Sequence, residues 1–204
     1  MKNKITLTGV LSEPLNVPSK SGEVFYNATM DDGNGNVLPI RYHEIKDNPP
    51  QGGEQYSIIG NVRTRKTHNP EAKSGFVETF VFTSFKEPED ISVTNAIDIC
   101  GMIKKKSQIY RKPQAKNKQM LYFILENSFE RNQKKFTNYI PCVVWGSLAD
   151  DFDRYNIGDY ITIQGYLRSR TYHKTVENGK KEERIAYECY VTSFKEATDD
   201  ERND

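Results

Sequence analysis

The sequence lacks a charge excess of either sign. Its 204 residues include 29 lysines and arginines and 28 aspartates and glutamates, for a net charge of +1. A chain with this balance has no global attraction to nucleic acid or to an anionic membrane surface. Any surface that binds a polyanion must therefore be a local basic patch.

Long apolar runs are also missing. No segment approaches the ~20 residues of a membrane-spanning helix. The first residues, MKNKITLTGV, carry lysines without an apolar stretch of signal-peptide length. We therefore expect a soluble intracellular protein with no membrane partner.

Cysteine is scarce, with only Cys100, Cys142 and Cys189. Their number is odd, they lie far apart, and no C-x-x-C pair is present, so neither a disulfide framework nor a zinc knuckle is indicated. Each cysteine lies in a strand-like apolar run. We predict buried thiols that act as small hydrophobic side chains.

Motifs of enzymes are absent as well. His43, His68 and His173 are not spaced as metal ligands, and no P-loop, paired carboxylates or Ser/His/Asp arrangement can be found. We predict a binding protein without catalytic activity, metal or cofactor.

What the sequence does contain is an internal repeat. The residues TSFKE occur at 83–87 and again at 192–196, and such a repeat sets the architecture of the whole chain. Other segments correspond in the same order, such as NKITLTGVLSEP with NAIDICGMIKKK, and YSIIGNVRTRKTH with YITIQGYLRSRTYH. We predict two tandem domains, 1–90 and 95–196, and an acidic tail, 197–204.

Each domain is predicted to consist of β-strands. Segments such as KITLTGV and IAYECYVTSF alternate in polarity and are rich in β-branched and aromatic residues, which is typical of half-buried strands. Only Gly146 to Asp159 has helical spacing, through Leu148, Phe152 and Tyr155. Three strands, a short helix and two strands is the order of the OB fold, a five-stranded Greek-key barrel that often binds oligonucleotides. We therefore predict an all-β chain of two tandem OB folds, each with at most a short helix.

The second domain resembles the bacterial single-stranded DNA-binding protein family. The segments NAIDICGMI, YIPCVVWGSLADDFDRYNIGDYITIQGYLRSRTYH and ENGKKEERIAYECYVTSF carry the resemblance in order. It extends to the whole chain only through the repeat, and the tandem arrangement is similar to that of family members with two OB folds in one chain. The resemblance implies binding of single-stranded DNA in replication, recombination or repair. It also implies a homodimer with four OB folds, in a bacterial cytoplasm or nucleoid or from a phage or mobile element.

A face of aromatic rings and cations is predicted on two strands of the second domain. Because side chains alternate along a strand, Tyr139 and Trp145 point outward while Ile140, Cys142 and Val144 fill the barrel. On the strand that starts at Tyr160, the same rule places these residues on one face: Tyr166, Arg168, Arg170 and Tyr172. Rings that stack on bases and cations that follow phosphates are the elements that bind unpaired strands.

The resemblance assigns roles residue by residue. It places Phe129, Tyr139, Trp145 and Tyr172 where the family keeps base-stacking rings. For each ring, the alternative is ordinary packing against a loop or a subunit. For the lysines in the list that follows, the alternative is a solvated hairpin without DNA contact. The predicted DNA-binding residues are Trp145, Tyr139, Tyr172, Phe129, Arg168, Arg170, Tyr166, Lys104, Lys105, Lys106, Lys118, Lys134 and Lys135.

The first domain departs from this pattern. The positions that correspond to the four rings are Gly33, Val37, His43 and Thr67, so those stacking aromatics are absent. Residues 1–90 carry a net charge of −2, against +3 for residues 91–204. We hypothesise that this domain serves mainly as an assembly or partner surface. Weaker DNA contact is predicted for Arg41, Arg63, Arg65 and Lys66.

The acidic tail, EATDDERND, has no apolar residue after Ala197. In the family, an acidic C-terminus recruits replication and repair proteins through a hydrophobic tip, so recruitment of such partners by this route is in doubt. We expect a solvated tail. Two other functions stay open: a primosome or conjugation accessory protein whose barrels mainly bind proteins, and an RNA-binding OB protein.

Overall fold

The computed structural model describes residues 1–19, 22–67, 76–90, 92, 94–111, 119–131, 133–175, 179 and 181–203. The strands are β1 (Asn3–Leu11), β2 (Leu15–Pro18), β3 (Val24–Asp31), β4 (Val37–His43), β5 (Gln55–Thr67), β6 (Phe76–Lys86), β7 (Asn95–Lys106), β8 (Tyr110–Arg111), β9 (Gln119–Arg131), β10 (Lys134–Trp145), β11 (Tyr160–Thr175) and β12 (Lys181–Glu196). The helices are α1 (Ser147–Phe152) and α2 (Asp199–Asn203).

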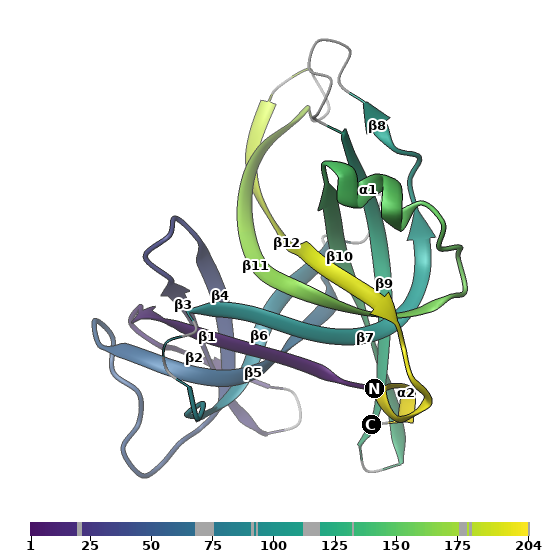
Figure 1. Cartoon of the computed structure of the whole chain (residues 1–204). Helices are drawn as coiled ribbons and strands as arrows, with labels where there is room; N and C mark the ends of the chain where they lie inside the picture. The colour runs from purple at the N-terminus through teal and green to yellow at the C-terminus, as the bar shows by residue number, and fades with distance from the viewer. Residues whose placement is uncertain are drawn as a thin grey trace.

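The strands form two barrels of one topology (Figure 1). In the first, β1 pairs with β3 and β5, β3 with β4, β5 with β6, and the parallel pair β4–β6 closes the ring. In the second, β7, β9, β10, β12 and β11 repeat the ring, with β10–β12 as the parallel pair. The short strands β2 and β8 pair with β3 and β9. The predicted tandem OB folds are confirmed.

The barrel interiors follow the two-residue period of the sequence. Ile140, Cys142 and Val144 of β10 are buried, as predicted. All three cysteines are buried and free, which confirms the expectation for the thiols. Burial raises the pKa of the Cys142 thiol well above its usual range, so this side chain is neutral at physiological pH.

Helix α1 closes one end of the second barrel. The predicted helical segment is helical only at Ser147–Phe152. Phe152 packs on Phe123 and Phe194, with ring centroids 4.4 and 5.0 Å away. In the first barrel, Tyr42 packs on Phe85 at 4.8 Å, and Phe85 has the same place in TSFKE as Phe194. The recurring motif therefore supplies a core ring to each barrel.

The barrels meet where β1 and β7 pair as antiparallel strands, from Asn3 opposite Ile99 to Leu7 opposite Asn95. The Asn3 amide donates to the Val62 carbonyl (2.8 Å) and accepts from the Val62 N–H (2.9 Å). The Asn95 amide does the same with Leu167, at 2.7 and 3.1 Å. The asparagine that opens each repeat thus ties its own barrel to the seam, and the two barrels are related by an approximate two-fold axis.

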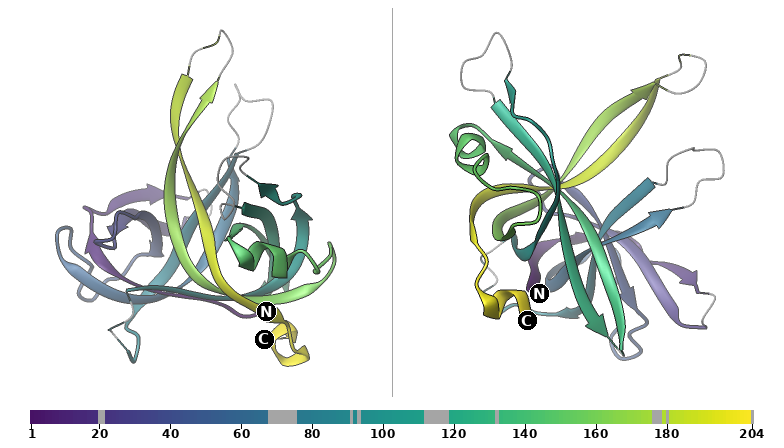
Figure 2. Two further views of the ribbon diagram at one scale, coloured as in Figure 1. Left: turned by 45° about the horizontal axis from the view of Figure 1, so that its top comes forward. Right: turned by 90° about the vertical axis from the view of Figure 1, so that its right-hand side faces the viewer.

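The tail is only partly solvated: Thr198, Asp199 and Asp200 are exposed, as expected, whereas Glu201 and Arg202 are half-buried. Helix α2 lies beside the N-terminus (Figure 2), and the Lys2 N–H donates to the Glu201 carbonyl at 3.3 Å. The Glu201 carboxylate pairs with Lys195 at 2.9 Å, and the Arg202 guanidinium lies 5.1 Å from the centre of the Tyr160 ring. Charged residues of the tail therefore find partners on the second barrel. Among the residues that the structure describes, none lies in a helix long and apolar enough to cross a membrane.

Candidate nucleic-acid interface

The outer face of β10 presents the rings of Tyr139 and Trp145, both half-buried. The indole Nε1 of Trp145 is buried and has no hydrogen-bond partner within the described part of the chain. Between the two rings, Val143 is the parallel-strand partner of Tyr190 in β12. This pairing places the face of β10 directly beside the ribbon formed by β11 and β12.

That ribbon carries a ladder of rings and guanidinium groups. Tyr166 stacks on Tyr190 with centroids 4.9 Å apart. The Arg168 guanidinium lies 5.1 Å from the centre of the Tyr190 ring, and that of Arg170 lies 5.6 Å from Tyr172. Cation–π contacts of this kind fix where the charges sit on the sheet. We call these five residues the tyrosine–arginine ladder; it extends along the β11–β12 hairpin, which projects from the barrel (Figure 2).

A buried carboxylate lies against the ladder. Glu188 is 1% exposed and accepts hydrogen bonds from Nε of Arg168 (3.0 Å) and Nε of Arg170 (3.3 Å). The two arginine side chains are 22% and 47% exposed, so each keeps a route to solvent. Glu188 therefore orients both guanidinium groups while it offsets one of their two charges.

Tyr122 of β9 lies close to the same charges. Burial, and after it the negative charge of Glu188, raises the pKa of Tyr122 to about 12, against a smaller opposite effect of Arg170. Its phenol is therefore neutral at physiological pH, and a neutral ring adds to the apolar part of this face.

The predicted lysines differ in their partners. Lys104 pairs with Glu126 at 3.0 Å. Lys106, 14% exposed, pairs with the Asp153 carboxylate and donates to the Tyr155 carbonyl, each at 2.8 Å, so it ties β7 to the segment after α1. Four predicted lysines are exposed: Lys104, Lys105, Lys134 and Lys135. Lys118 and His68 lie outside the described residues, and only the backbone of Lys66 is described.

Phe129 lies apart from the other predicted rings. It pairs across the β9–β10 hairpin with Phe136, nine residues before Trp145, and a rise of about 3.3 Å per residue puts the two ends of this segment roughly 30 Å apart. Phe129 stacks on Phe136 with centroids 5.3 Å apart, and the Arg63 guanidinium of the first barrel lies 5.1 Å from its ring centre. The predicted ring set is thus divided between the ladder face and the region where the barrels meet.

The first barrel repeats part of the ladder with other residues. Arg63 lies 4.1 Å from the centre of the Phe82 ring, and by strand pairing these two residues correspond to Arg168 and Tyr190. His43, which stands in the place of Trp145, packs on Phe25 with centroids 4.5 Å apart. The outer face of the first barrel therefore carries rings, although not at the four corresponding positions.

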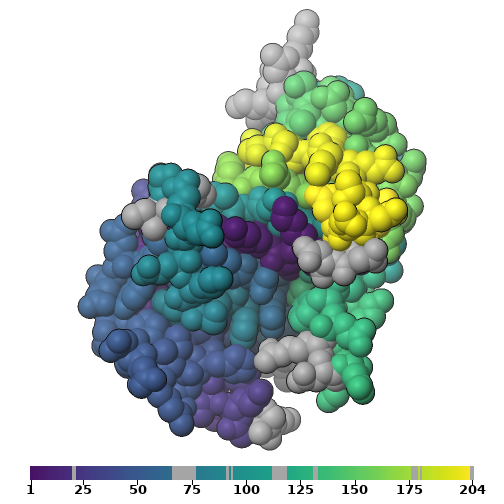
Figure 3. Space-filling model, turned by 60° about the horizontal axis from the view of Figure 1, so that its bottom comes forward, coloured from purple at the N-terminus to yellow at the C-terminus, as the bar shows by residue number. Residues whose placement is uncertain are grey.

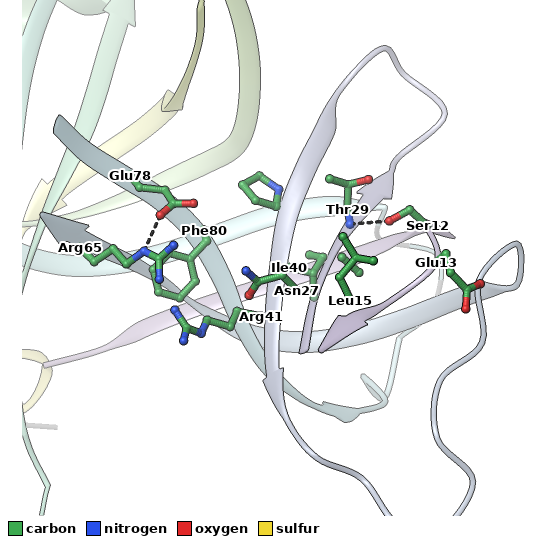
Figure 4. Close-up of a pocket in the computed structure, with 12 residues that line it drawn as sticks. Ser12, Glu13, Leu15, Asn27, Thr29, Ile40, Arg41, Arg65, Glu78 and Phe80 are labelled. Atoms are coloured by element: carbon green, nitrogen blue, oxygen red, sulfur yellow. Dashed lines mark hydrogen bonds and ion pairs between the residues drawn. The ribbon is translucent and has the colours of Figure 1, made fainter. Parts of the chain in front are cut away.

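The two remaining arginines predicted in the first barrel border a pocket of about 250 Å³ (Figure 4). Arg65 forms an ion pair with Glu78. The Arg41 guanidinium lies 4.5 Å from the centre of the Phe25 ring, and burial, with a further contribution from Arg65, lowers its pKa against the opposing effect of Glu78. The ion pair leaves Arg65 less positive potential to offer to a phosphate than an unpaired arginine would have.

Several residues of these faces were missed by the sequence analysis. In the second barrel they are Tyr122, Glu188 and Tyr190, and in the first they are Phe25 and Phe82. Most stand next to a buried strand residue, as Phe82 does to Val81, so strand alternation could have indicated them. They do not correspond to the base-stacking positions that the family resemblance implies, so the resemblance does not indicate them.

The chain has detectable relatives. The model described as the single-strand binding protein family matches residues 94–195. None of the curated proteins matches the chain. Wild-type single-stranded DNA binding protein from Thermus aquaticus matches at a TM-score of 0.69 and 14% identity, covering 97% of this chain and 93% of that one.

Two further solved structures are similar to different extents. A deletion mutant of the Thermus aquaticus protein matches at a TM-score of 0.70 and 14% identity, with 97% of this chain and 95% of that one covered. A complex of Plasmodium falciparum SSB with single-stranded DNA matches at 0.41 and 19% identity, covering 50% and 92%. The two Thermus matches show a fold shared over nearly the whole chain.

Proposed function

The chain belongs to the single-strand binding protein family, and we propose that it holds single-stranded DNA mainly on the outer face of its second barrel. The observation that supports this site is the tyrosine–arginine ladder beside Trp145. Base stacking contributes roughly 1–3 kcal/mol per base and accepts any base, since every base has a π-face. Binding therefore has little sequence preference, and the guanidinium groups of Arg168 and Arg170 follow the phosphates.

The protein acts by binding alone, in replication, recombination or repair, where exposed single strands need cover. Within the described residues, no cluster of His, Cys, Asp or Glu could hold a metal ion. The proposal includes a cytoplasmic location and a homodimer in which four barrels act together. Sedimentation equilibrium tests the homodimer, which should have twice the mass of one chain. Partner proteins of the replication and repair machinery belong to the same proposal.

Trp145 is the only tryptophan, so its fluorescence reports on this face. We expect dT oligonucleotides of about 35 nucleotides to quench it, and Trp145→Ala to weaken binding about tenfold by anisotropy, since one stacking ring is lost. Trp145→Phe keeps a ring and should bind within a few fold of the wild type. Ile157→Ala, at a loop position that is 64% exposed, is the matched control.

Absence of quenching, together with an unchanged affinity of Trp145→Ala, would show that the ring only packs. The partner-binding alternative would then take precedence. Matched RNA oligonucleotides in the same assay separate DNA binding from the RNA-binding alternative, because stacking and phosphate contact alone do not distinguish the sugars.

A further inference from the structure

A second aromatic and basic site lies between the two barrels. A cleft of about 360 Å³ is lined by residues of both: Glu23, Phe25, His43, Arg63, Phe82, Phe129, Lys134 and Phe136. Next to it, a smaller cavity of about 170 Å³ shares Arg63 and Phe129 and reaches Asn3 and Asn127 at the seam. The two hollows therefore meet at Arg63 and Phe129 on the boundary of the barrels.

The cleft exists because the two hairpins at the seam differ in length. In the second barrel, Asn138 accepts from the Thr64 N–H of β5 at 3.0 Å, and the Tyr139 N–H donates to the Thr64 hydroxyl at 2.8 Å. In the first barrel, Asn36 makes the equivalent contact to Ser169 of β11. The hairpin beyond Asn138 is much longer than the one beyond Asn36. Only the long hairpin reaches past the seam, so its tip stands beside the first barrel (Figure 3).

The long hairpin completes a ring cluster on the first barrel. Arg63 lies between a ring of each barrel, 4.1 Å from the centre of Phe82 and 5.1 Å from that of Phe129. His43 meets Phe82 edge to face at 5.3 Å. Phe136 stacks on Phe129 and is still 44% exposed. An exposed phenylalanine backed by a second ring is a stacking platform whose open face can receive another flat ring.

The charges of the cleft select the class of ligand. Arg63 and Lys134 contribute two positive charges against one negative charge from Glu23. Rings with adjacent cations are the combination that binds unpaired nucleic acid, since bases stack and phosphates are neutralised. A protein partner of acidic character would be attracted by the charges but would not need the exposed ring face.

From this geometry we propose that the cleft is a second base-docking site for the same DNA strand, built by both barrels and centred on Phe136, Phe129 and Arg63. The proposal rests on the proposed function. One OB fold accommodates about 4–16 nucleotides. A DNA strand longer than this passes from the ladder face to the cleft. The first barrel thereby contributes to DNA binding through a site that it does not form alone.

The test compares the full-length wild type with Phe136→Ala, using dT oligonucleotides of about 8 and about 35 nucleotides. We expect about a tenfold loss of affinity for the long strand and none for the short strand, which occupies the ladder face. Ile157→Ala serves again as the control for loss of an exposed apolar side chain. Thermal unfolding of each variant checks that the fold is retained.

A direct readout comes from the double variant Trp145→Phe/Phe136→Trp, whose only tryptophan stands in the cleft. The long strand should quench its fluorescence and the short strand should not. If Phe136→Ala keeps full affinity for the long strand and the new tryptophan is not quenched, the cleft site is refuted while a loss in Trp145→Ala still supports the ladder face. Equal losses for both strands would also overturn it, because Phe136 would then serve the ladder site itself.

Discussion

Removal of the Glu188 charge should strengthen DNA binding while it destabilises the protein. Glu188→Gln keeps the shape and one carbonyl oxygen, but it leaves the Arg168 and Arg170 charges without their shared anion. Loss of one partner of a buried ion pair costs about 3–5 kcal/mol. Here both guanidinium groups retain access to water, so we expect a smaller loss of about 2 kcal/mol in the free energy of unfolding. For a chain of this size that lowers the Tm by roughly 4–8 °C.

The gain in affinity follows from counterion release. One further cation available to a single strand steepens the plot of log Kobs against log salt by about 0.7, which at 0.1 M salt corresponds to roughly fivefold tighter binding. The assay is anisotropy with labelled dT of about 35 nucleotides over a salt series, alongside thermal unfolding. A variant that is both less stable and tighter-binding is hard to explain unless the ladder contacts phosphates.

Glu182→Gln is the matched control, since Glu182 lies on the same strand and pairs with Arg184 at 2.8 Å but is 46% exposed. An exposed pair contributes at most about 1 kcal/mol, so both Tm and the salt slope should change little. If Glu188→Gln leaves the salt slope unchanged, the ladder arginines do not reach phosphates. If it leaves the Tm unchanged, Glu188 does not orient them in the way that the distances indicate.

Two further predictions concern the seam and the tail. Asn95→Ala should lower the free energy of unfolding by about 2 kcal/mol, because the buried N–H and C=O of Leu167 lose their hydrogen-bond partner. Chemical denaturation measures this loss. A loss no larger than that caused by replacing an exposed asparagine with alanine would contradict the role of Asn95 at the seam. The hydrogen bond from Lys195, and after it that from the Thr198 N–H, lowers the pKa of Glu201 to about 2, so its stabilising effect is complete above the unfolded pKa of about 4.3 and is lost as the pH falls towards 2. Wild type and Glu201→Gln should therefore differ in Tm at pH 7 and converge near pH 2, and a difference that does not depend on pH would refute the ion pair.

The repeat, the strand order and the barrel interiors could be predicted from the sequence because each depends on local spacing. Ile140, Cys142 and Val144 share one face of β10 by strand alternation, and this period places them in the barrel interior. Val143, on the other face, is buried as well, which the period does not predict. The same rule places Tyr166, Arg168, Arg170 and Tyr172 on one face. The five repeated residues TSFKE supply Phe85 and Phe194, each of which packs against the core of its own barrel.

The contacts of the site residues and of the tail depend on which strands lie side by side once each barrel has closed and the two barrels have paired. Glu188 lies under Arg168 and Arg170 only because β12 pairs with β11 in one register. The resemblance predicts base stacking for Phe129, whereas the long β9–β10 hairpin places its ring beside Arg63 of the other barrel, and no local pattern encodes that contact. The acidic tail reads as a solvated segment, whereas Lys195 and Tyr160 are brought within its reach by the fold. Spacing along the chain thus determined what each barrel buries, and the pairing of distant strands decided which rings and charges lie together on its surface.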